Sequence, residues 1–133
     1  MLTMLILIIR TDKPEAEIGL YNSTAKLAYS TWTAHRRLAE TIHLRLQELL
    51  GSQDKKLHDI QGIVVYKGPG SFTGLRIGLS VANALAYSLD IPIASTQGKN
   101  WIISGCEALA QGRNETAAMP EYGSPPHVTP PKH

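Results

Sequence analysis

The sequence predicts one α/β lobe in which helices cover a mixed five-stranded sheet. Three observations lead to this fold class: an aliphatic run near the N-terminus, a hairpin-like pair of segments after it, and then apolar strands that alternate with amphipathic helices. A length of 133 residues fits one domain, and 43% hydrophobic with 18% charged residues is typical of a globular protein. The expected element order is β-β-β-α-β-α-β-α.

The first three strands are expected within the first 32 residues. Residues 5–9 are all aliphatic, which indicates a central strand that is buried on both faces. Residues 17–21 and 26–32 flank Asn22-Ser23-Thr24, so they are expected to pair as a hairpin with a short turn. Three strands therefore precede the first helix.

From Thr33 onwards the spacing of apolar residues becomes that of an amphipathic helix, which is expected to end at Gly51. The apolar positions of this helix are Leu38, Ile42, Leu46, Leu49 and Leu50. The later elements are expected as a strand at 60–66, a helix at about 73–89, a strand at 91–95 and a helix at about 99–111. The lobe is expected to cover residues 1–111, and the proline-rich residues 112–133 to form an extended tail without a core.

Charge and cysteine content argue against several functional classes. The net charge is +2 and the cations are scattered, so tight direct binding of nucleic acid is not expected. The single Cys106 cannot form an internal disulfide, which fits a reducing cytosol and a cytoplasmic protein. The N-terminal apolar run lacks a basic leader, and no stretch is apolar for long enough to span a membrane. No metal is expected, because His35 and His43 lie eight residues apart on one helix.

A glycine-rich corner between the fourth strand and the second helix is the most informative segment. Such a strand–loop–helix corner presents free N–H groups that can bind an anion. The candidate anion-binding residues are Gly68, Pro69, Gly70, Ser71, Phe72, Thr73, Gly74 and Arg76. The Gly-Lys-Ser/Thr ending of a Walker loop is absent, and Ser71 lacks the Gly-x-Ser-x-Gly context of a hydrolase nucleophile. A tight corner that only opens the helix remains the alternative, and no catalytic residue is assigned.

Residues 68–80, with residues 81–86 and Ile91-Pro92 after them, resemble the Gly-Pro-Gly-Ser-Phe-Thr-Gly-Leu-Arg-Ile-Gly signature of the TsaB (YeaZ) and Gcp-like family. Residues 36–40 are similar to the Arg-Arg-His-Ala-Glu opening of the family's first helix, and residues 57–60 to its lead into the fourth strand. The resemblance covers roughly residues 1–111.

This resemblance implies an actin-like (ASKHA, ribonuclease-H-like) lobe and a role in threonylcarbamoyladenosine (t6A) modification of tRNA. It further implies a subunit without catalysis of its own, which pairs with a catalytic TsaD subunit while a TsaE ATPase acts alongside. A homodimer through the same helices is the other assembly that it implies. No cofactor is expected for the isolated chain, ATP and Mg²⁺ are expected only in a complex, and tRNA is expected as an indirect partner.

Three departures from the family pattern limit this transfer. Where the family's first strand ends in Ile-Asp-Thr, the chain has Ile9-Arg10-Thr11, so a cation replaces the carboxylate that would lie near a metal and phosphate, and Asp12 is an uncertain substitute. The family's first-helix histidine is replaced by Leu38. The family ordinarily has two similar lobes, whereas the sequence passes from residue 111 almost directly to a proline-rich end.

A row of small residues along the second helix favours a partner role. Gly74, Gly78, Ala82 and Ala86 recur every fourth residue, which lets another backbone approach closely. With the start of the first helix, the predicted partner interface consists of Arg36, Arg37, Glu40, Gly74, Gly78, Ala82 and Ala86. The alternative is that this row packs against the chain's own first helix, because a close contact inside the lobe would need the same small residues.

Three functional hypotheses follow. The first is a TsaB-like binding module for TsaD. The second is a nucleotide-binding actin-fold lobe with phosphotransferase-like activity, with the nucleotide at residues 68–74. The third is a self-associating lobe without the modification role. Binding of ATP and Mg²⁺ separates the second hypothesis from the others, and co-purification with TsaD separates the first from the third.

Overall fold

The computed structural model describes residues 3–70 and 72–119, and the predicted element order is confirmed within them. The strands are β1 (Leu5–Arg10), β2 (Glu15–Asn22), β3 (Ala25–Thr33), β4 (Gly62–Tyr66) and β5 (Ile93–Thr96). The α-helices are α1 (Leu38–Ser52), α2 (Phe72–Leu89) and α3 (Trp101–Ala110). Two 3-10 turns, η1 (His35–Arg37) and η2 (Leu57–Asp59), lie on either side of α1.

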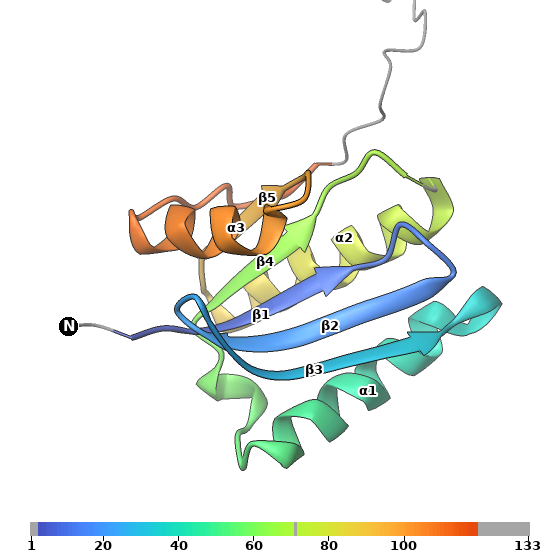
Figure 1. The fold of residues 1–133 in the computed structure, drawn as a ribbon, viewed down its shortest axis with the longest axis horizontal. Helices are drawn as coiled ribbons and strands as arrows, with labels where there is room; N and C mark the ends of the chain where they lie inside the picture. Colours follow the sequence, from blue (N-terminus) through green and yellow to red (C-terminus); the bar gives the residue numbers. More distant parts are fainter. Residues whose placement is uncertain (1–2, 71, 120–133) are drawn as a thin grey trace, which may run out of the picture.

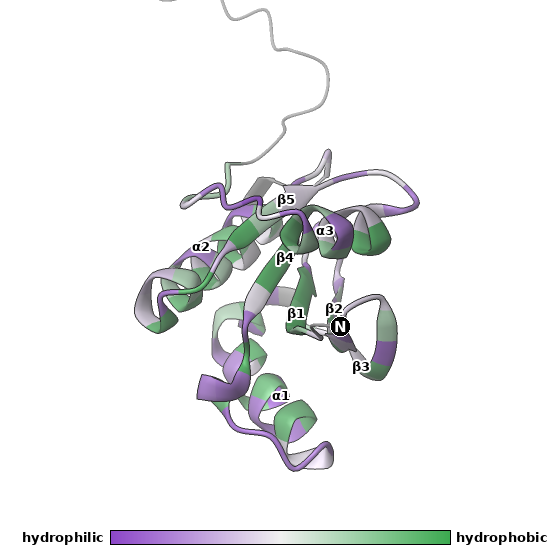
Figure 2. Ribbon diagram, turned by 90° about the vertical axis from the view of Figure 1, so that its left-hand side faces the viewer, coloured by the Kyte–Doolittle hydropathy of each residue, from purple (hydrophilic) through white to green (hydrophobic). Residues whose placement is uncertain are grey.

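The strands form one sheet in the order β3-β2-β1-β4-β5. Strand β2 pairs antiparallel with both β3 and β1, whereas β1, β4 and β5 run parallel. Helices α1 and α2 cover one face of this sheet, and α3 covers β4 and β5 on the other face (Figures 1 and 2). The front of β2 and β3 in Figure 1 therefore has no helix above it.

The core lies around β1 and β4, because these two strands are central and covered on both faces. All five residues 5–9 are buried, and so are all five residues of β4. Figure 2 shows the same distribution, with hydrophobic residues on the two central strands and on the helix faces turned toward them. A run of apolar residues without alternation is what such a doubly covered strand requires.

The ordered body extends beyond residue 111, where the sequence suggested that it would stop. The Glu115 N–H donates to the Ile93 carbonyl over 2.8 Å, and the Glu115 carboxylate accepts bonds from the Ser95 N–H and hydroxyl at 2.7 and 2.6 Å. The Asn83 side chain exchanges two hydrogen bonds with the backbone of Ala118, which is 2% exposed. Residues 113–118, named the edge strap here, thus cover the free edge of β5, while residues 120–133 lie outside the described part.

Among the described residues, none of the helices combines the length and the hydropathy that a bilayer crossing requires.

Candidate functional site: the loop before α2 and the face formed by α1 and α2

The loop that joins β4 to α2 passes directly over the end of β1. A Cβ atom on Gly70 would overlap the Cβ atom of Asp12, so a side chain at Gly70 would push the loop away. The Thr11 hydroxyl donates to the Gly74 carbonyl over 2.8 Å, which fixes the start of α2 to the same strand end. Gly68 has a φ of +111°, a backbone conformation that favours glycine. Close approach and backbone geometry therefore explain these glycines.

The carboxylate at this corner is already paired inside the lobe. Asp12 is 8% exposed, and its two oxygens accept bonds from the Arg10 guanidinium at 2.7 and 3.2 Å. This hydrogen bond raises the pKa of Arg10 further above its usual value, and the guanidinium lies 4.0 Å from the centre of the Tyr66 ring. Arg10 thus occupies the position where the family resemblance implied a carboxylate, and it holds Asp12 as its counter-ion.

The predicted anion-binding residues are only partly brought together. Thr73 and Gly74 line a hollow of about 480 Å³, whose wall also carries Lys13 and Arg36. Pro69, Gly70 and Arg76 are exposed, Gly68 is buried, and Ser71 and the side chain of Phe72 lie outside the described part. Across the described ranges, no three His, Cys, Asp or Glu side chains are grouped as a metal would require.

The prediction that Gly78, Ala82 and Ala86 face a partner is wrong. A Cβ atom on Gly78 would overlap the side chain of Thr11 at the end of β1. Ala82 is 0% exposed and Ala86 is 3% exposed, because α2 packs on β4 and β1 along this side. The alternative of packing inside the lobe is correct, except that the closest neighbour of Gly78 is Thr11, directly after β1, and not α1. Gly74, at the start of the row, is half-buried.

The opposite side of α2 faces outward and is almost free of charge. Arg76 is the one charged residue in the 18 residues of this helix. The outward positions whose side chains are exposed are Thr73, Arg76, Ser80, Ala84, Tyr87 and Ser88, and Ile77 and Val81 are half-buried beside them. Tyr87 is 89% exposed. The sequence already carried this signal, namely a helix with polar small residues but no charged face, and the pattern of glycines drew attention to the wrong side.

Two hollows lie between α1 and α2, one toward each end of the two helices. The hollow of about 480 Å³ lies where both helices begin and includes Leu38 and Ile77. A second hollow of about 290 Å³ lies toward their other ends and includes Leu46, Leu50 and Leu85. We call this surface, together with the outward positions of α2, the α1–α2 groove. Of the predicted interface residues at the start of α1, Arg36 lines the first hollow, whereas Arg37 and Glu40 line neither hollow and pair with each other over 3.4 Å.

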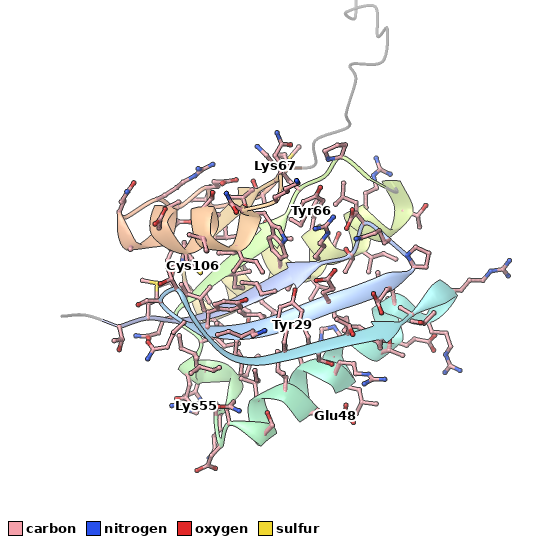
Figure 3. All side chains as sticks on the ribbon, in the orientation of Figure 1. Tyr29, Glu48, Lys55, Tyr66, Lys67 and Cys106 are labelled. Carbon is pink, nitrogen blue, oxygen red and sulfur yellow. The ribbon has the colours of Figure 1, made fainter. Side chains whose placement is uncertain are left out.

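Two other titratable groups lie on the side of the sheet that faces α3 (Figure 3). The Tyr29 ring lies over Gly19, and its hydroxyl donates to the Glu17 carboxylate over 2.5 Å. Burial first, and then Glu17, raise the pKa of Tyr29 well above its usual value. Cys106 on α3 is buried in the core, and burial raises the pKa of its thiol to about 11. Both groups therefore stay protonated at neutral pH.

Comparisons with known proteins agree with the sequence resemblance. Residues 32–118 match the family model described as "TsaD: tRNA N6-adenosine threonylcarbamoyltransferase". The tRNA threonylcarbamoyladenosine biosynthesis protein TsaB of Escherichia coli (strain K12) is 33% identical over 114 residues, which is 82% of this chain and 44% of that protein. The protein of the same name from Bacillus subtilis (strain 168) is 46% identical over 65 residues, which is 49% of this chain and 25% of that protein.

A solved structure supports the fold. The structure described as YeaZ from Pseudomonas aeruginosa superposes with a TM-score of 0.67 at 24% identity, over 82% of this chain and 50% of that one. The actin-like, ribonuclease-H-like lobe is therefore confirmed as the fold. The chain spans half or less of the length of each of these relatives.

Proposed function

Because the chain belongs to the Gcp-like family of TsaB (YeaZ) and TsaD proteins, we propose that it acts in the biosynthesis of threonylcarbamoyladenosine on tRNA. Its role there is that of a TsaB-like subunit, which binds a TsaD-type subunit and performs no chemistry itself. The two curated TsaB relatives support the pathway, since both are named for it. A TsaE-type ATPase is expected to act in the same assembly.

The single observation that carries the partner role is the outward side of α2, on which Arg76 is the one charged residue. A surface helix normally presents charged residues to water, whereas this one presents Ser80, Ala84 and Ser88 with the half-buried Ile77 and Val81. Small side chains at the spacing of a helical turn let a second helix pack closely. The α1–α2 groove beside them offers apolar hollows that a partner's side chains would fill, as at the depleted-charge core of a protein interface.

The chemistry available in the described lobe favours a subunit without catalysis. Asp12 is neutralised by Arg10, so it is poorly suited to hold Mg²⁺ against a phosphate. Cys106 is buried and has a raised pKa, so it is a poor nucleophile. These facts weaken the nucleotide-binding, phosphotransferase-like hypothesis, and no specific observation favours it.

A pull-down with the TsaD-type subunit of the same organism tests the proposal. Ala84→Arg places a long charged side chain on the outward side of α2 and is expected to weaken binding by about a few kcal/mol, because a partner helix could no longer approach. The matched control is Ala110→Arg, at an exposed position on α3. Helix α3 lies on the opposite face of the sheet from α1 and α2. Both variants should melt like the unmodified protein.

Three results would contradict the proposal. The first is that the unmodified chain fails to bind the TsaD-type subunit. The second is that Ala84→Arg binds it as well as Ala110→Arg does. The third is a large drop in melting temperature for Ala84→Arg, since that would show that this side of α2 is packed inside the lobe.

A further inference from the structure

We infer that a hollow between the start of α3 and the β2–β3 hairpin binds a phosphate group, which is carried by a nucleotide or by the backbone of an RNA. This α3 hollow has a volume of about 330 Å³ and lies on the face of the sheet opposite to α1 and α2. The inference therefore does not depend on the partner role proposed above, and either one can fail without the other.

Two parts of the chain that are far apart in the sequence line the α3 hollow. Tyr21 and Lys26 belong to β2 and β3, whose front has no helix above it (Figure 1). The other side is formed by the first turn of α3 and the loop before it, through Lys99, Asn100 and residues 102–103. Among the described residues, two cations and no Asp or Glu line this hollow.

The two lysines are free to meet an anionic ligand. Both are exposed, and neither forms an ion pair within the described part of the chain. The Lys26 ammonium lies 5.4 Å from the centre of the Tyr29 ring, which keeps it on the front of the sheet (Figure 3). Glu17 shares this front, but it does not line the hollow, and its carboxylate accepts the hydrogen bond of the Tyr29 hydroxyl.

The start of α3 adds backbone donors to the two lysines. The first N–H groups of a helix have no partner inside the helix, and they attract an anion. In α3 the Asn100 side chain does not cap these groups, and the first turn has no acidic residue. Asn100 and residues 102–103 line the hollow, so the uncapped start of the helix lies at its edge.

The Tyr21 hydroxyl is independent evidence for a ligand. Tyr21 is 8% exposed, yet its hydroxyl has no hydrogen-bond partner within the described part of the chain, whereas a buried hydroxyl normally has one. No described side-chain N or O atom that is cut off from solvent lacks a partner, so this hydroxyl reaches the solvent. Tyr21 lines the α3 hollow, and burial raises the pKa of its hydroxyl, which is therefore a donor at neutral pH.

The kinds of donor indicate which anion fits. A planar carboxylate is bound best by the forked guanidinium of an arginine, whereas lysine binds phosphate as a point charge. No Arg lines the α3 hollow. Two ammonium groups, a hydroxyl and a helix start supply donors from several directions, which suits the tetrahedral oxygens of a phosphate. Ile102 and the exposed Ile103 offer apolar contact to the nucleoside that carries it.

Two variants, each with a matched control, provide the test. The charge variant is Lys26→Gln with Lys99→Gln, and its control is Lys55→Gln with Lys56→Gln, which removes the same charge at two exposed lysines beyond α1. Thermal melts establish that both are folded. If the charge variant is not, Lys99→Gln alone is compared with Lys55→Gln.

The hydroxyl variant is Tyr21→Phe. Because the Tyr21 hydroxyl has no partner in the described part of the lobe, this variant is expected to melt like the unmodified chain. Its control is Tyr29→Phe, which loses the hydrogen bond to Glu17 and is expected to melt at a lower temperature.

The first measurement follows amide NMR signals during titration with inorganic phosphate, adenosine monophosphate or, as the probe without phosphate, adenosine. Phosphate and the monophosphate are expected to shift the amides of Lys99, Ile102 and Ile103, and adenosine to leave them unchanged. Binding of the monophosphate should be at least about tenfold weaker in the charge variant and about three- to tenfold weaker in Tyr21→Phe. The lysine control should bind it normally.

The second measurement is the affinity for tRNA at several salt concentrations, which identifies the source of the phosphate. The slope of log affinity against log salt should fall by about two in the charge variant and stay unchanged in the lysine control. This result without a shift by the monophosphate would identify the RNA backbone as the ligand. The monophosphate shift without tRNA binding would identify a nucleotide.

Four results would overturn the inference. The first is that neither phosphate, the monophosphate nor tRNA shifts the amides at the start of α3. The second is that the lysine control loses as much affinity as the charge variant. The third is that Tyr21→Phe binds as tightly as the unmodified chain. The fourth is a lower melting temperature for Tyr21→Phe, since its hydroxyl would then be bonded within the lobe.

Discussion

At the scale of single residues, α2 can pack this closely against the end of β1 because Gly78 has no side chain. The Thr11 side chain occupies the space that a Cβ atom on Gly78 would need, and its hydroxyl is bonded to the Gly74 carbonyl one turn earlier. The helix thus approaches β1 as closely as a glycine permits. Gly70 does the same for the loop, which lies against Asp12. Two glycines of the family-like motif therefore act by close packing within the lobe.

Replacing Gly78 by Ala is expected to destabilise the lobe by about 1–3 kcal/mol, because the new methyl group overpacks the contact with Thr11. The matched control is Gly51→Ala near the end of α1, where a Cβ atom meets nothing within 4 Å. That change should stabilise the protein by about 0.5–1 kcal/mol through the higher helix propensity of alanine. Urea unfolding of both variants measures the two effects, and equal stabilities would show that Gly78 is not a close contact.

At the scale of elements, the sequence predicted the type and order of every strand and helix but not every direction in which a helix faces. The aliphatic residues 5–9 could only be a doubly covered strand, and Leu38, Ile42 and Leu46 share one face of α1. Helix α2 is different, because it has small or apolar residues on both of its sides. The low charge of α2 was visible in the sequence, but periodicity alone could not say which of its sides would meet the sheet. The burial of Ala82 identifies that side.

The edge strap was also missed, since no apolar periodicity marks residues 113–118. It holds β5 through side chains: Asn114 accepts from the Ile93 N–H, and Glu115 accepts from the Ser95 N–H, at 3.2 and 2.7 Å. These bonds satisfy the outward N–H groups of an edge strand, which would otherwise be open to another chain. The Glu115 carboxylate and the Asn114 amide oxygen therefore accept hydrogen bonds that the backbone of a sixth strand would otherwise accept. No periodic pattern in a single sequence marks such side-chain contacts.

Replacing Glu115 by Ala is expected to cost about 1–3 kcal/mol, because the Ser95 N–H and hydroxyl lose a charged acceptor. Amide hydrogen exchange should become faster at Ser95 and stay unchanged at Ile8 in β1. The control is Glu107→Ala on α3, which makes the same substitution at an exposed glutamate. Unchanged exchange at Ser95 in the Glu115 variant would mean that the strap does not protect the edge in solution.

At the scale of the whole molecule, the buried core of the described residues extends to the end of the strap. The central strands are covered on both faces, and the buried residue furthest along the described chain is Ala118, which the Asn83 side chain of α2 holds by two hydrogen bonds. The same molecule spans half or less of its relatives' length. Its fold was predictable because the apolar segments form one core. The proposed partner surface was not predictable, because it depends on how α1 and α2 are placed relative to each other.

Two truncations are expected to behave differently for this reason. Deleting residues 120–133 should leave a cooperative thermal transition at nearly the same temperature, because the buried core and the strap bonds of the described residues lie within residues 3–118. Deleting residues 112–133 removes the strap, opens the edge of β5 and exposes the side of α2 around Asn83, so the lobe should lose several hydrogen bonds of about 0.5–1.5 kcal/mol each. The shorter chain should melt lower and aggregate through its open edge. Identical melting curves for the two truncated chains would show that residues 112–118 contribute nothing, and a low melting temperature for the longer one would show that residues 120–133 contribute to the stability of the lobe.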